Sequence, residues 1–398
     1  MIQNLLPRLE VDVFRSNHRP YYIVTPEWVQ HSMGARVTFH LCHILNELGY
    51  EAYVVAQNQA PNLRTPLLTK EIIERHKSEN RPSIAIYTEL MWGNTLNADV
   101  VVRYITNRIG MYGNDIIDKE ALYYYWCEGY STDQNPNLLC FPTIDHKIFN
   151  DIGVNNSKRK GFAYYAHKYL AEGNGVIADR IKRNGISLCK DIPRTHKEIA
   201  DILRSVKVLY LYEDSAVGGE AALCGCPVVL VKTDFFLGME SIFNCFDAVI
   251  PENEINVESD YKSKKNPADG YKELFANSSE YIRKFIQDTQ GASLGYRGRD
   301  DLLSYCEKYK RVCIYGGGIF ASMVYSALSI MGINIECFIV SDCMLENNDE
   351  TYLSLPVRPM SWLKSQHSPE CGLVVAMVKG NAEQVVPSLN ALGLRYFY

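Results

Sequence analysis

One pattern recurs three times along this chain and restricts the folds open to it. It consists of a short apolar run, a turn of small and polar residues, a segment with helical spacing, and another apolar run. The first copy comprises YYIVT, HSMGAR, VTFHLCHILNELGY and EAYVVAQ, between residues 21 and 57. Apolar runs of strand length that alternate with helical segments are typical of parallel sheets, because each helix carries the chain back to the same edge. The sequence therefore predicts an α/β fold built from three such units.

The other two copies define the remaining domains. The second includes GFAYYAHK, the strand VKVLYLYED, and a helix over THKEIADILRS in which Thr195 is the N-cap and Glu198 completes a capping box. The third includes RVCIYGGGIFASMVYSAL, INIECFIVSD and GLVVAMV. A chain of 398 residues is too long for one ordinary core, so we expect domains over 1–150, 151–300 and 306–398.

The stretch from Val312 to Ile335 has 24 residues without a charged side chain, which is long enough to span a bilayer. Three glycines near its start and Asn334 near its end favour a strand, a glycine turn and a buried helix instead. The N-terminal segment MIQNLLPRLEVDVFRSNHRP contains no apolar core of a secretory signal. We therefore expect a cytoplasmic protein, with peripheral contact at the inner membrane face left open.

Charge and cysteine usage argue against two kinds of partner. The formal net charge of −5 provides no basic surface for a nucleic-acid backbone, so nucleic acid is not an expected partner. The 12 cysteines are scattered through apolar segments, as expected for reduced thiols. Cys224 and Cys226 form C-x-C without a second pair at zinc-ligand spacing, so no metal site is predicted.

In an open α/β sheet, ligands bind at the carboxyl ends of the strands, so the loops after the apolar runs hold the candidate site residues. His31, Gly34 and Arg36 follow the first run. Gly34 would let a substrate approach the backbone, and His31 or Arg36 would meet an anionic or hydroxyl group. An ordinary turn with a surface histidine explains the same residues.

A carboxylate follows the run SIAIY directly. Glu89 would lie at the carboxyl end of that strand, where a general base for a hydroxyl nucleophile would be placed. Gly93 and Asn94 predict a turn, and a helix that begins near Asn97 would carry Arg103. We assign Asn94 and Arg103 to the substrate site. The alternative is an edge carboxylate satisfied by the backbone of Gly93 and Asn94.

Two loops of the second unit suit an anionic ligand. Lys168 follows a tyrosine-rich strand and would serve as a point charge beside a diphosphate, although a plain surface lysine fits equally well. In SAVGGEAALCGCPVVLV, Ser215, Gly218 and Gly219 would keep the amides at a helix N-terminus open to an anion. Glu220 would lie in the first helical turn, where it either accepts hydrogen bonds from ribose hydroxyls or caps the helix.

The third unit carries a loop of the dinucleotide-binding type. Gly316, Gly318 and Ala321 form G-x-G-x-x-A between a strand and a helix, and Asp342 closes the next strand. This spacing fits NAD(P) binding, but such units also occur as structural or interaction modules. NAD(P) is therefore the second choice, and no required cofactor is the first.

Together these loops resemble those of the GT-B glycosyltransferases, particularly the GT4-like kind. SMGARVTFHLCHILNELGYEAYVV is similar to their first glycine loop and the helix that ends in L..LG. EDSAVGGEAALCGCPVVLV is similar to their acidic loop followed by EA.ACG.PVV. YTELMWGNTLNADVVVRY resembles a block, PE...GNP..A..VVRW, of bacterial polysaccharide transferases. The likeness covers residues 20 to 300.

The resemblance implies a GT-B architecture of two facing Rossmann-like domains, with a third, small Rossmann-like domain outside that pattern. The second domain would bind the nucleotide-sugar donor and the first the glycan acceptor. Glu220, paired with Glu213, would hold the donor ribose. The amides of Val217 to Gly219 would hold the diphosphate, and Lys168 would neutralise the leaving group. The resemblance implies no divalent metal.

The chain departs from the family at the donor loop. Glu213 and Glu220 enclose six residues where the family has seven, and Asp214 to Val217 replace its EGFG tetrapeptide. These differences leave the donor sugar and the retaining or inverting outcome open. The acceptor, the linkage and the oligomeric state also stay open.

We expect a glycosyltransferase that acts in bacterial surface-polysaccharide biosynthesis, such as that of capsule or O-antigen. Glu89 is the expected base of an inverting scheme, and His31 is the second candidate. Other glycan-assembly enzymes are conceivable partners. Two alternatives remain: a nucleotide-sugar oxidoreductase or epimerase that uses the loop from Gly316 to Ala321, and a non-catalytic scaffold derived from a transferase.

Overall fold

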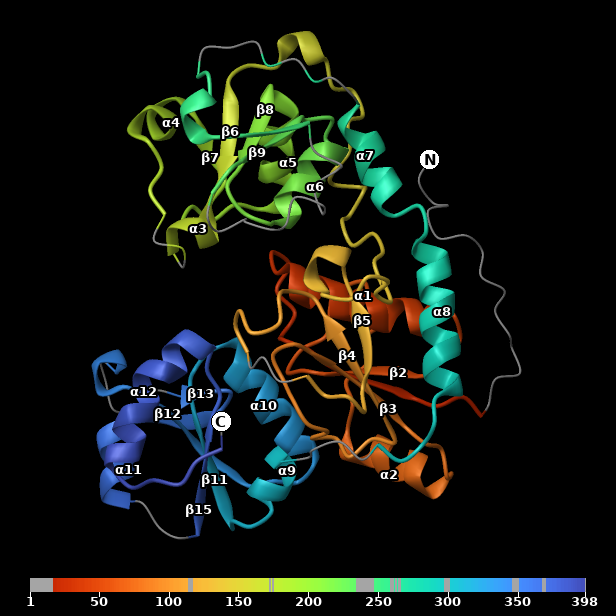
Figure 1. The fold of residues 1–398 in the computed structure, drawn as a ribbon, viewed down its shortest axis with the longest axis vertical. Helices are drawn as coiled ribbons and strands as arrows, with labels where there is room; N and C mark the ends of the chain where they lie inside the picture. Colours follow the sequence, from red (N-terminus) through yellow and green to blue (C-terminus); the bar gives the residue numbers. More distant parts are fainter. Residues whose placement is uncertain are drawn as a thin grey trace. The chain divides into compact units, whose positions relative to one another are not determined.

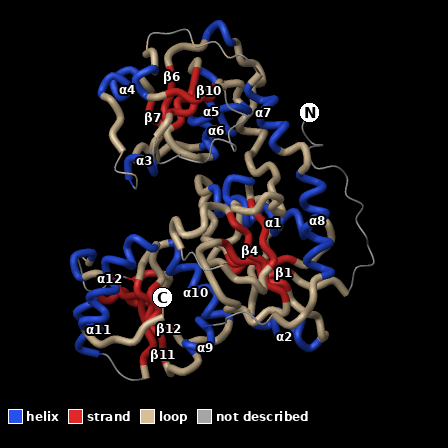
Figure 2. Tube along the Cα trace, viewed as in Figure 1, coloured by secondary structure: helices blue, strands red, loops and turns tan. Residues whose placement is uncertain are grey.

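The computed structural model describes residues 17–113, 117–171, 173, 175–233, 247–257, 261, 263, 266–296, 301–345, 351–366 and 370–397. These residues form three five-stranded sheets with their helices (Figures 1 and 2). Each sheet lies within one of the three predicted units, so the α/β fold with three Rossmann-like units is confirmed. Contacts divide the chain into two compact units: one holds 127–129 and 140–281, and the other holds the remaining described residues.

The first sheet is parallel throughout, in the order β2-β1-β3-β4-β5. Its strands are β1 (Tyr21–Val24), β2 (Ala52–Val55), β3 (Ile84–Thr88), β4 (Val100–Ile105) and β5 (Leu122–Tyr125). Helix α1 (Met33–Glu47) connects β1 to β2, and α2 (Lys70–Ser78) connects β2 to β3. The side chains of Ser32 and Thr69 cap these helices. Because the strands run in one direction, their carboxyl ends share one edge of the sheet.

Strand β4 replaces the helix that was expected to begin near Asn97, and that prediction is wrong. Asn97 has a φ of 47°, which asparagine tolerates better than most residues, and the chain enters β4 three residues later. The run VVVRYI favours a strand because β-branched side chains pack well on a pleated surface. Arg103 therefore lies on a central strand and is fully buried.

The second sheet is also parallel throughout, in the order β10-β9-β8-β6-β7. Its strands are β6 (Phe162–Tyr165), β7 (Ile186–Ser187), β8 (Val208–Leu211), β9 (Val228–Val231) and β10 (Ala248–Ile250). Its helices are α3 (His167–Ala171), α4 (Asp179–Asn184), α5 (His196–Ser205), α6 (Ala216–Leu223) and α7 (Pro267–Leu274). The predicted capping box of Thr195 and Glu198 is confirmed at the start of α5.

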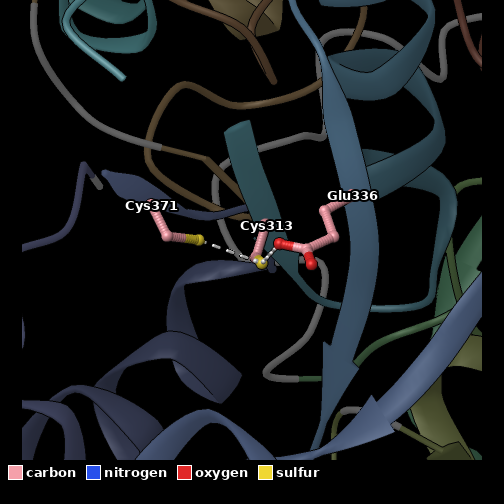
Figure 3. Close-up of side chains that lie close together, drawn as sticks. All are labelled: Cys313, Glu336 and Cys371. Atoms are coloured by element: carbon pink, nitrogen blue, oxygen red, sulfur yellow. Dashed lines mark hydrogen bonds between the residues drawn. The ribbon is translucent and has the colours of Figure 1, made fainter. Parts of the chain in front are cut away.

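The third sheet has the order β13-β14-β12-β11-β15 and is parallel except for the β13–β14 hairpin. Its strands are β11 (Arg311–Tyr315), β12 (Ile335–Val340), β13 (Thr351–Tyr352), β14 (Leu355–Pro359) and β15 (Cys371–Val375). Its helices are α9 (Asp301–Cys306), α10 (Ile319–Ile330), α11 (Met360–Gln366) and α12 (Lys379–Ala391). On β11 and β15, Cys313 and Cys371 lie side by side (Figure 3).

The uncharged stretch from Val312 to Ile335 forms most of β11, the glycine turn and α10, so the prediction of a strand, a turn and a buried helix is confirmed. Within the described part of the chain, no helix combines the length and the hydropathy that crossing a bilayer requires. No disulfide joins any of the described cysteines.

The first and third sheets belong to one compact unit and share one hydrophobic core. Tyr22 and Val24 of β1 belong to the same cluster of buried side chains as Val324 of α10 and Phe338 of β12. Polar contacts reinforce this junction. Gln57 Nε2 donates to Ser326 Oγ at 2.8 Å, and the backbone N of Lys379 donates to the carbonyl of Tyr112 at 2.8 Å.

Helix α8 (Ser278–Gly291) packs on the first sheet, although it follows the second sheet in the chain. The hydroxyl of Tyr21 on β1 lies 2.8 Å from Thr289 Oγ1, and the hydroxyl of Tyr124 on β5 donates to Asp288 Oδ2 at 2.6 Å. Phe285 stacks on Tyr21 and meets Tyr124 edge to face. Of the two consecutive helices α7 and α8, only α7 therefore stays with the second sheet.

Candidate functional site

Glu89 lies at the carboxyl edge of the first sheet, directly after β3. The residue is 4% exposed, and its Oε2 accepts a hydrogen bond from the backbone N of Thr106 at 2.8 Å. The hydroxyl of Thr106 lies 3.3 Å from the same oxygen. Thr106 directly follows β4, the neighbour of β3, so the register of the sheet brings the two residues together. We refer to Glu89 and Thr106 as the Glu89 site.

Burial raises the pKa of Glu89 to about 7, and hydrogen bonds from Thr106 and the nearby backbone keep it from rising further. The alternative role named Gly93 and Asn94 as the backbone partners of this carboxylate, and the structure corrects the partners: the backbone of Thr106, after β4, takes their place. A carboxyl group with this pKa is partly ionised at neutral pH and can take up a proton from a hydroxyl group.

Two glycines shape the Glu89 site. A Cβ on Gly34, the second residue of α1, would lie 4.0 Å from the hydroxyl oxygen of Thr106. A Cβ on Gly113 would lie 2.6 Å from the carbonyl oxygen of Glu89. This is too close for a side chain, so the close approach of the backbone at this position requires glycine. The prediction that Gly34 lies near the site is therefore supported by its position. Gly113 was missed because nothing in the sequence shows that its loop returns to Glu89.

His31 and Arg36 lie on either side of the start of α1. His31 is exposed in the turn before the helix. Arg36 is 4% exposed, and its backbone N donates to the carbonyl of Ser32 within the first turn. This burial leaves little of the Arg36 side chain for an anionic substrate. The role of His31 as a second base stays a prediction.

Arg103 stabilises the loop that follows Glu89. Its guanidinium donates to the carbonyls of Met91 at 3.0 Å and Gly93 at 2.6 Å, and it forms an ion pair of 3.2 Å with Asp118. Arg103 was expected to reach the substrate from a helix. Its position on β4 gives it a structural role instead, because a fully buried guanidinium requires these partners.

Asn94 closes the same loop. Its side chain accepts a hydrogen bond from the N of Ala98 at 2.9 Å and donates to the carbonyl of Ala98 at 2.8 Å. The hydroxyl of Tyr87 on β3 accepts a hydrogen bond from the N of Leu96 at 2.9 Å. Asn94 is 4% exposed, so the structure places it as a loop-closing residue rather than as a surface for the acceptor.

In the second sheet, Glu213 is the buried anion at the carboxyl edge. It follows β8, is 0% exposed, and its Oε2 accepts a hydrogen bond from the N of Tyr169 at 2.7 Å. Tyr169 lies in α3, after β6, so Glu213 connects the ends of two neighbouring strands. Lys168 precedes Tyr169 and is half-buried. The structure thus brings the predicted Glu213 and Lys168 to the same edge.

Tyr165, the last residue of β6, is a member of this site that the sequence analysis missed. Its side chain forms a hydrogen bond with Ser215. Burial raises the pKa of Tyr165 well above its usual value, and the charges of Glu213 and Glu220 raise it further. The negative charges of both predicted glutamates therefore disfavour ionisation of the same hydroxyl group, that of Tyr165. The two tyrosines that end the run FAYY are the sequence feature that could have indicated Tyr165.

Helix α6 begins earlier than expected. Ser215 is its N-cap and accepts a hydrogen bond from the N of Val217 at 3.4 Å, while the N of Gly218 donates to the carbonyl of Ser215 at 3.1 Å. Gly218 and Gly219 therefore lie inside the helix rather than in the turn before it. The expectation that the amides of Val217 and Gly218 stay open for a diphosphate is corrected, because Ser215 engages both.

Glu220 is the fifth residue of α6, so the prediction that it lies in the first turn is wrong. It is 2% exposed. A Cβ on Gly219 would lie 2.9 Å from both Ile144 Cδ1 and Tyr271 Cε2. Gly219 thus lets α6 pack closely against Ile144 and against Tyr271 of α7, which is a packing role rather than the predicted contact with the donor.

The glycine loop of the third sheet has the backbone that its spacing predicts. Gly316 has a φ of 136°, and a Cβ there would lie 2.4 Å from the carbonyl oxygen of Ala376. Gly318 is the N-cap of α10, and Ala321 is fully buried in that helix. Asp342 lies two residues after β12, and its Oδ1 accepts a hydrogen bond from the N of Ser361 at 2.9 Å. Asp342 therefore caps α11.

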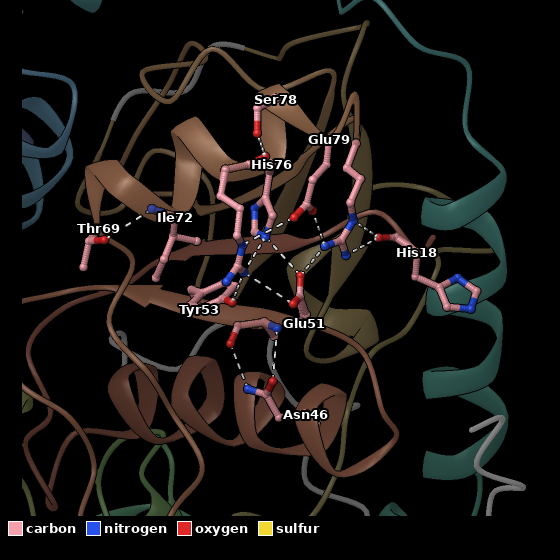
Figure 4. Close-up of polar contacts among 12 residues, drawn as sticks. His18, Asn46, Glu51, Tyr53, Thr69, Ile72, His76, Ser78 and Glu79 are labelled. Carbon is pink, nitrogen blue, oxygen red and sulfur yellow. Dashed lines mark hydrogen bonds and ion pairs between the residues drawn. The ribbon is translucent and has the colours of Figure 1, made fainter. Parts of the chain in front are cut away.

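A polar network that the sequence analysis did not predict joins α2 to the first sheet (Figure 4). His76 is 1% exposed; its Nδ1 lies 2.7 Å from the hydroxyl of Tyr22, and its Nε2 lies 3.0 Å from Glu51 Oε2. Arg81 donates to the same Glu51 oxygen at 2.6 Å. Burial lowers the pKa of His76 against the opposing effect of Glu51. Glu51 directly precedes β2, so this network lies at the amino end of that strand, away from the Glu89 site.

No protein-family profile matches this chain, and no curated protein matches it. Among solved structures, AviGT4, "a glycosyltransferase involved in Avilamycin A biosynthesis", is similar with a TM-score of 0.41 and 14% identity, over 70% of this chain and 100% of AviGT4. The "Spinosyn Rhamnosyltransferase SpnG" is similar with a TM-score of 0.33 and 10% identity, over 80% of this chain and 97% of SpnG. Similarity at this level carries no information about the function of this chain.

Proposed function

We propose that this chain is a glycosyltransferase that moves a sugar from a nucleotide-sugar donor to a hydroxyl group of a glycan acceptor. The observation that carries the proposal is the buried carboxyl group of Glu89, with a pKa of about 7, at the carboxyl end of a parallel strand. Transfer to a hydroxyl group requires a base with a pKa near the working pH. The resemblance of EDSAVGGEAALCGCPVVLV to the donor loop of GT-B enzymes supports the donor class.

The donor would bind at the carboxyl edge of the second sheet. Lys168 would lie beside the diphosphate as a point charge. Glu213 is a buried acid on that edge and Glu220 is a buried acid within α6, and carboxylates accept hydrogen bonds from ribose hydroxyls in nucleotide sites. Tyr165 and Ser215, which contact each other, would complete this pocket.

Glu89 would act on the acceptor. The hydroxyl group gives its proton to the Glu89 carboxylate while its oxygen forms a bond to the anomeric carbon of the donor sugar. The bond between that carbon and the diphosphate oxygen breaks, and the electron pair leaves with the nucleoside diphosphate, whose charge Lys168 balances. A single displacement of this kind inverts the configuration at the anomeric carbon. The scheme uses neither a metal ion nor a redox cofactor.

The finer assignment rests on the resemblance. We infer that the chain belongs to the GT4-like kind and acts in the cytoplasm on a growing bacterial surface glycan, such as capsule or O-antigen. The block YTELMWGNTLNADVVVRY supports this acceptor class, because it resembles a block of bacterial polysaccharide transferases. Within that block the structure gives Arg103 and Asn94 the loop-holding contacts described above, so Glu89 carries the chemical assignment.

Thermal unfolding with a panel of nucleotides tests the proposal. UDP, GDP, CDP and their sugars are each added to the full chain, and one nucleotide class should stabilise it. Saturation at 100 times the dissociation constant stabilises a folded protein by about 2.7 kcal/mol. The proposal fails if none of these ligands shifts the transition. Stabilisation by NAD(P) alone would favour an oxidoreductase that uses the loop after β11.

Two variants sharpen this measurement. Glu220→Gln should reduce the ligand-induced shift, since it removes the charge that would face the ribose. Glu89→Gln should leave the shift unchanged, since Glu89 belongs to the acceptor side. An equal loss in both variants would contradict the division of roles between the two sheets.

A further inference from the structure

Two thiols and a carboxylate converge at the amino end of the third sheet, outside the sites described above (Figure 3). Cys313 Sγ on β11 lies 3.4 Å from Cys371 Sγ on β15 and 4.0 Å from Glu336 Oε2 on β12. All three ligand atoms lie within 4.8 Å of one another. Both cysteines are buried, at 0% and 7% exposure. We refer to these three residues as the thiol–carboxylate cluster.

The strand register argues against a disulfide between Cys313 and Cys371. Cys371 lies opposite Arg311, while Cys313 lies opposite Leu373, so the two cysteines are offset by two residues along neighbouring parallel strands. Two residues of strand rise and the spacing between strands separate their Cα atoms by about 8 Å. Disulfides require Cα atoms within about 7 Å. The two sulfurs nevertheless lie 3.4 Å apart.

The carboxylate of Glu336 is oriented by a cation. Arg311 Nη1 donates to Glu336 Oε1 at 2.8 Å, which leaves Oε2 directed toward the sulfur of Cys313. Contacts of this kind, from outside the ligand set, hold a ligating carboxylate in place in metal sites. The Glu336 and Arg311 side chains are 29% and 37% exposed, so the carboxylate side of the cluster borders solvent.

We propose that Cys313, Cys371 and Glu336 bind a divalent zinc ion. Thiolate and carboxylate are both ligands of zinc, and thiolates select it over magnesium or calcium. An ion about 2.3 Å from both sulfurs would need them about 3.8 Å apart for a tetrahedral angle, so the sulfur pair would open by about 0.4 Å and the Glu336 carboxylate would move toward both sulfurs. Two thiolates, one carboxylate, the dication and the Arg311 guanidinium sum to zero charge, which removes the main cost of burying an ion.

This site is separate from the proposed transfer reaction. Arg311 and Cys371 are the first residues of β11 and β15, whereas the glycine loop follows the last residue of β11. The ion would connect three neighbouring strands of the sheet, β15, β11 and β12. Zinc bound by residues from several strands stabilises a fold directly, because the site does not exist in the unfolded chain. The inference therefore stands whether or not the chain transfers a sugar.

Metal content and cobalt substitution test the proposal on the full chain. After equilibration with zinc chloride and dialysis, plasma mass spectrometry should find about one zinc per chain. Cobalt added to the metal-free protein should produce a thiolate-to-cobalt charge-transfer band and the intense visible bands of tetrahedral coordination. Cys313→Ser and Cys371→Ser should lose the charge-transfer intensity and at least 10-fold in zinc affinity, and Glu336→Gln should weaken zinc binding as well.

Cys337→Ser is the matched control. Cys337 is buried on β12, and its thiol contacts Cys313 Sγ at 3.4 Å, but it is not one of the three clustered ligands. Its variant should keep the metal. Far-ultraviolet circular dichroism of each metal-free variant separates lost ligation from lost folding. The absence of zinc and cobalt binding in the wild-type chain, or equal binding in Cys313→Ser and wild type, would overturn the proposal. Loss of binding in Cys337→Ser would overturn the assignment of the three ligands.

Discussion

Glu89 retains its proton to an unusually high pH because the protein withdraws its carboxyl group from water. The same burial that makes Glu89 suitable as a base makes its ionised form costly. A pKa of about 7 in the folded chain, against an ordinary 4.5, corresponds to about 3 kcal/mol between the two protonation states. Both the stability and the activity of the chain should therefore change near neutral pH.

The first prediction concerns stability. Protonated Glu89 favours the folded state, and this contribution is complete below pH 4.5 and is lost as pH rises through about 7. Glu89→Gln removes the ionisation, so the variant should exceed wild type in free energy of unfolding by up to about 3 kcal/mol at pH 8. At pH 5 the difference should nearly vanish. Urea titrations followed by tryptophan fluorescence measure the free energy of unfolding at each pH. The signal reports the unit that contains Glu89, because all four tryptophans lie outside residues 127–281.

Glu198→Gln is the control for that experiment. Glu198 caps α5 at the surface, and its hydrogen bonds with Thr195 lower its pKa. Removing its charge should give no gain in stability at pH 8. A gain of equal size in both variants would trace the effect to net charge rather than to the burial of Glu89.

A second prediction concerns Thr106, which we assign as a positioning residue. Thr106→Val keeps the backbone N–H that binds Glu89 but removes the hydroxyl group, so the pKa of Glu89 should rise. The acid limb of the kcat/KM profile should move to higher pH, because Glu89 acts as a base only when ionised. Thr106→Ser keeps the hydroxyl group and should retain the wild-type profile. If the pH profiles of Thr106→Val and wild type coincide, the Thr106 hydroxyl group does not position Glu89 for the reaction.

Among the elements, β4 and α6 show why local patterns mislead. A helix was expected from near Asn97, but three valines and the burial of Arg103 between β3 and β5 decide for a strand. In α6 the Gly-Gly pair suggested a turn, yet Ser215 caps the chain before it and Gly219 allows close packing on Tyr271. Sequence spacing therefore located the loops, and tertiary packing decided which of their side chains are buried.

A third prediction separates two glycines of one loop. Gly316→Ala should destabilise the unit that contains the third sheet by about 2 kcal/mol or more, because it forces a side chain into the carbonyl of Ala376 at a positive φ. Gly318→Ala should change stability by less than about 0.5 kcal/mol, because nothing lies within 4 Å of its added Cβ. Thermal or urea unfolding compares the pair. Similar losses in both variants would contradict the described loop.

At the scale of the molecule, the sequence predicted three α/β units but not how they associate. The first and third sheets share one core, in which β1, α10 and β12 contribute neighbouring side chains. Helix α8 follows the second sheet in the chain but contacts the first sheet through Thr289 and Asp288. The two hydrogen bonds of α8 join residues 268 and 164 positions apart, and no local periodicity records them.

The fourth prediction follows from that shared core. Val324→Ala on α10 removes buried methyl groups from the core cluster that α10 shares with β1, so hydrogen exchange should accelerate in peptides of both the first and the third sheet. Val229→Ala on β9 is a matched change within the second sheet and should leave β1 peptides protected. Hydrogen-exchange mass spectrometry on the full chain measures the exchange rates of both variants. Acceleration confined to the third sheet in Val324→Ala would show that the two sheets unfold independently.

The release of nucleoside diphosphate tests the central claim most directly. The nucleotide-sugar that stabilises the chain is incubated with it, water serves as the hydroxyl nucleophile, and chromatography measures the released nucleoside diphosphate. Wild type should release it, and Glu89→Gln should do so at least about 100-fold more slowly, since positioned bases contribute 10²- to 10⁴-fold. The dissociation constant of the donor should stay within about 2-fold. Release by Glu89→Gln at the wild-type rate would contradict the account.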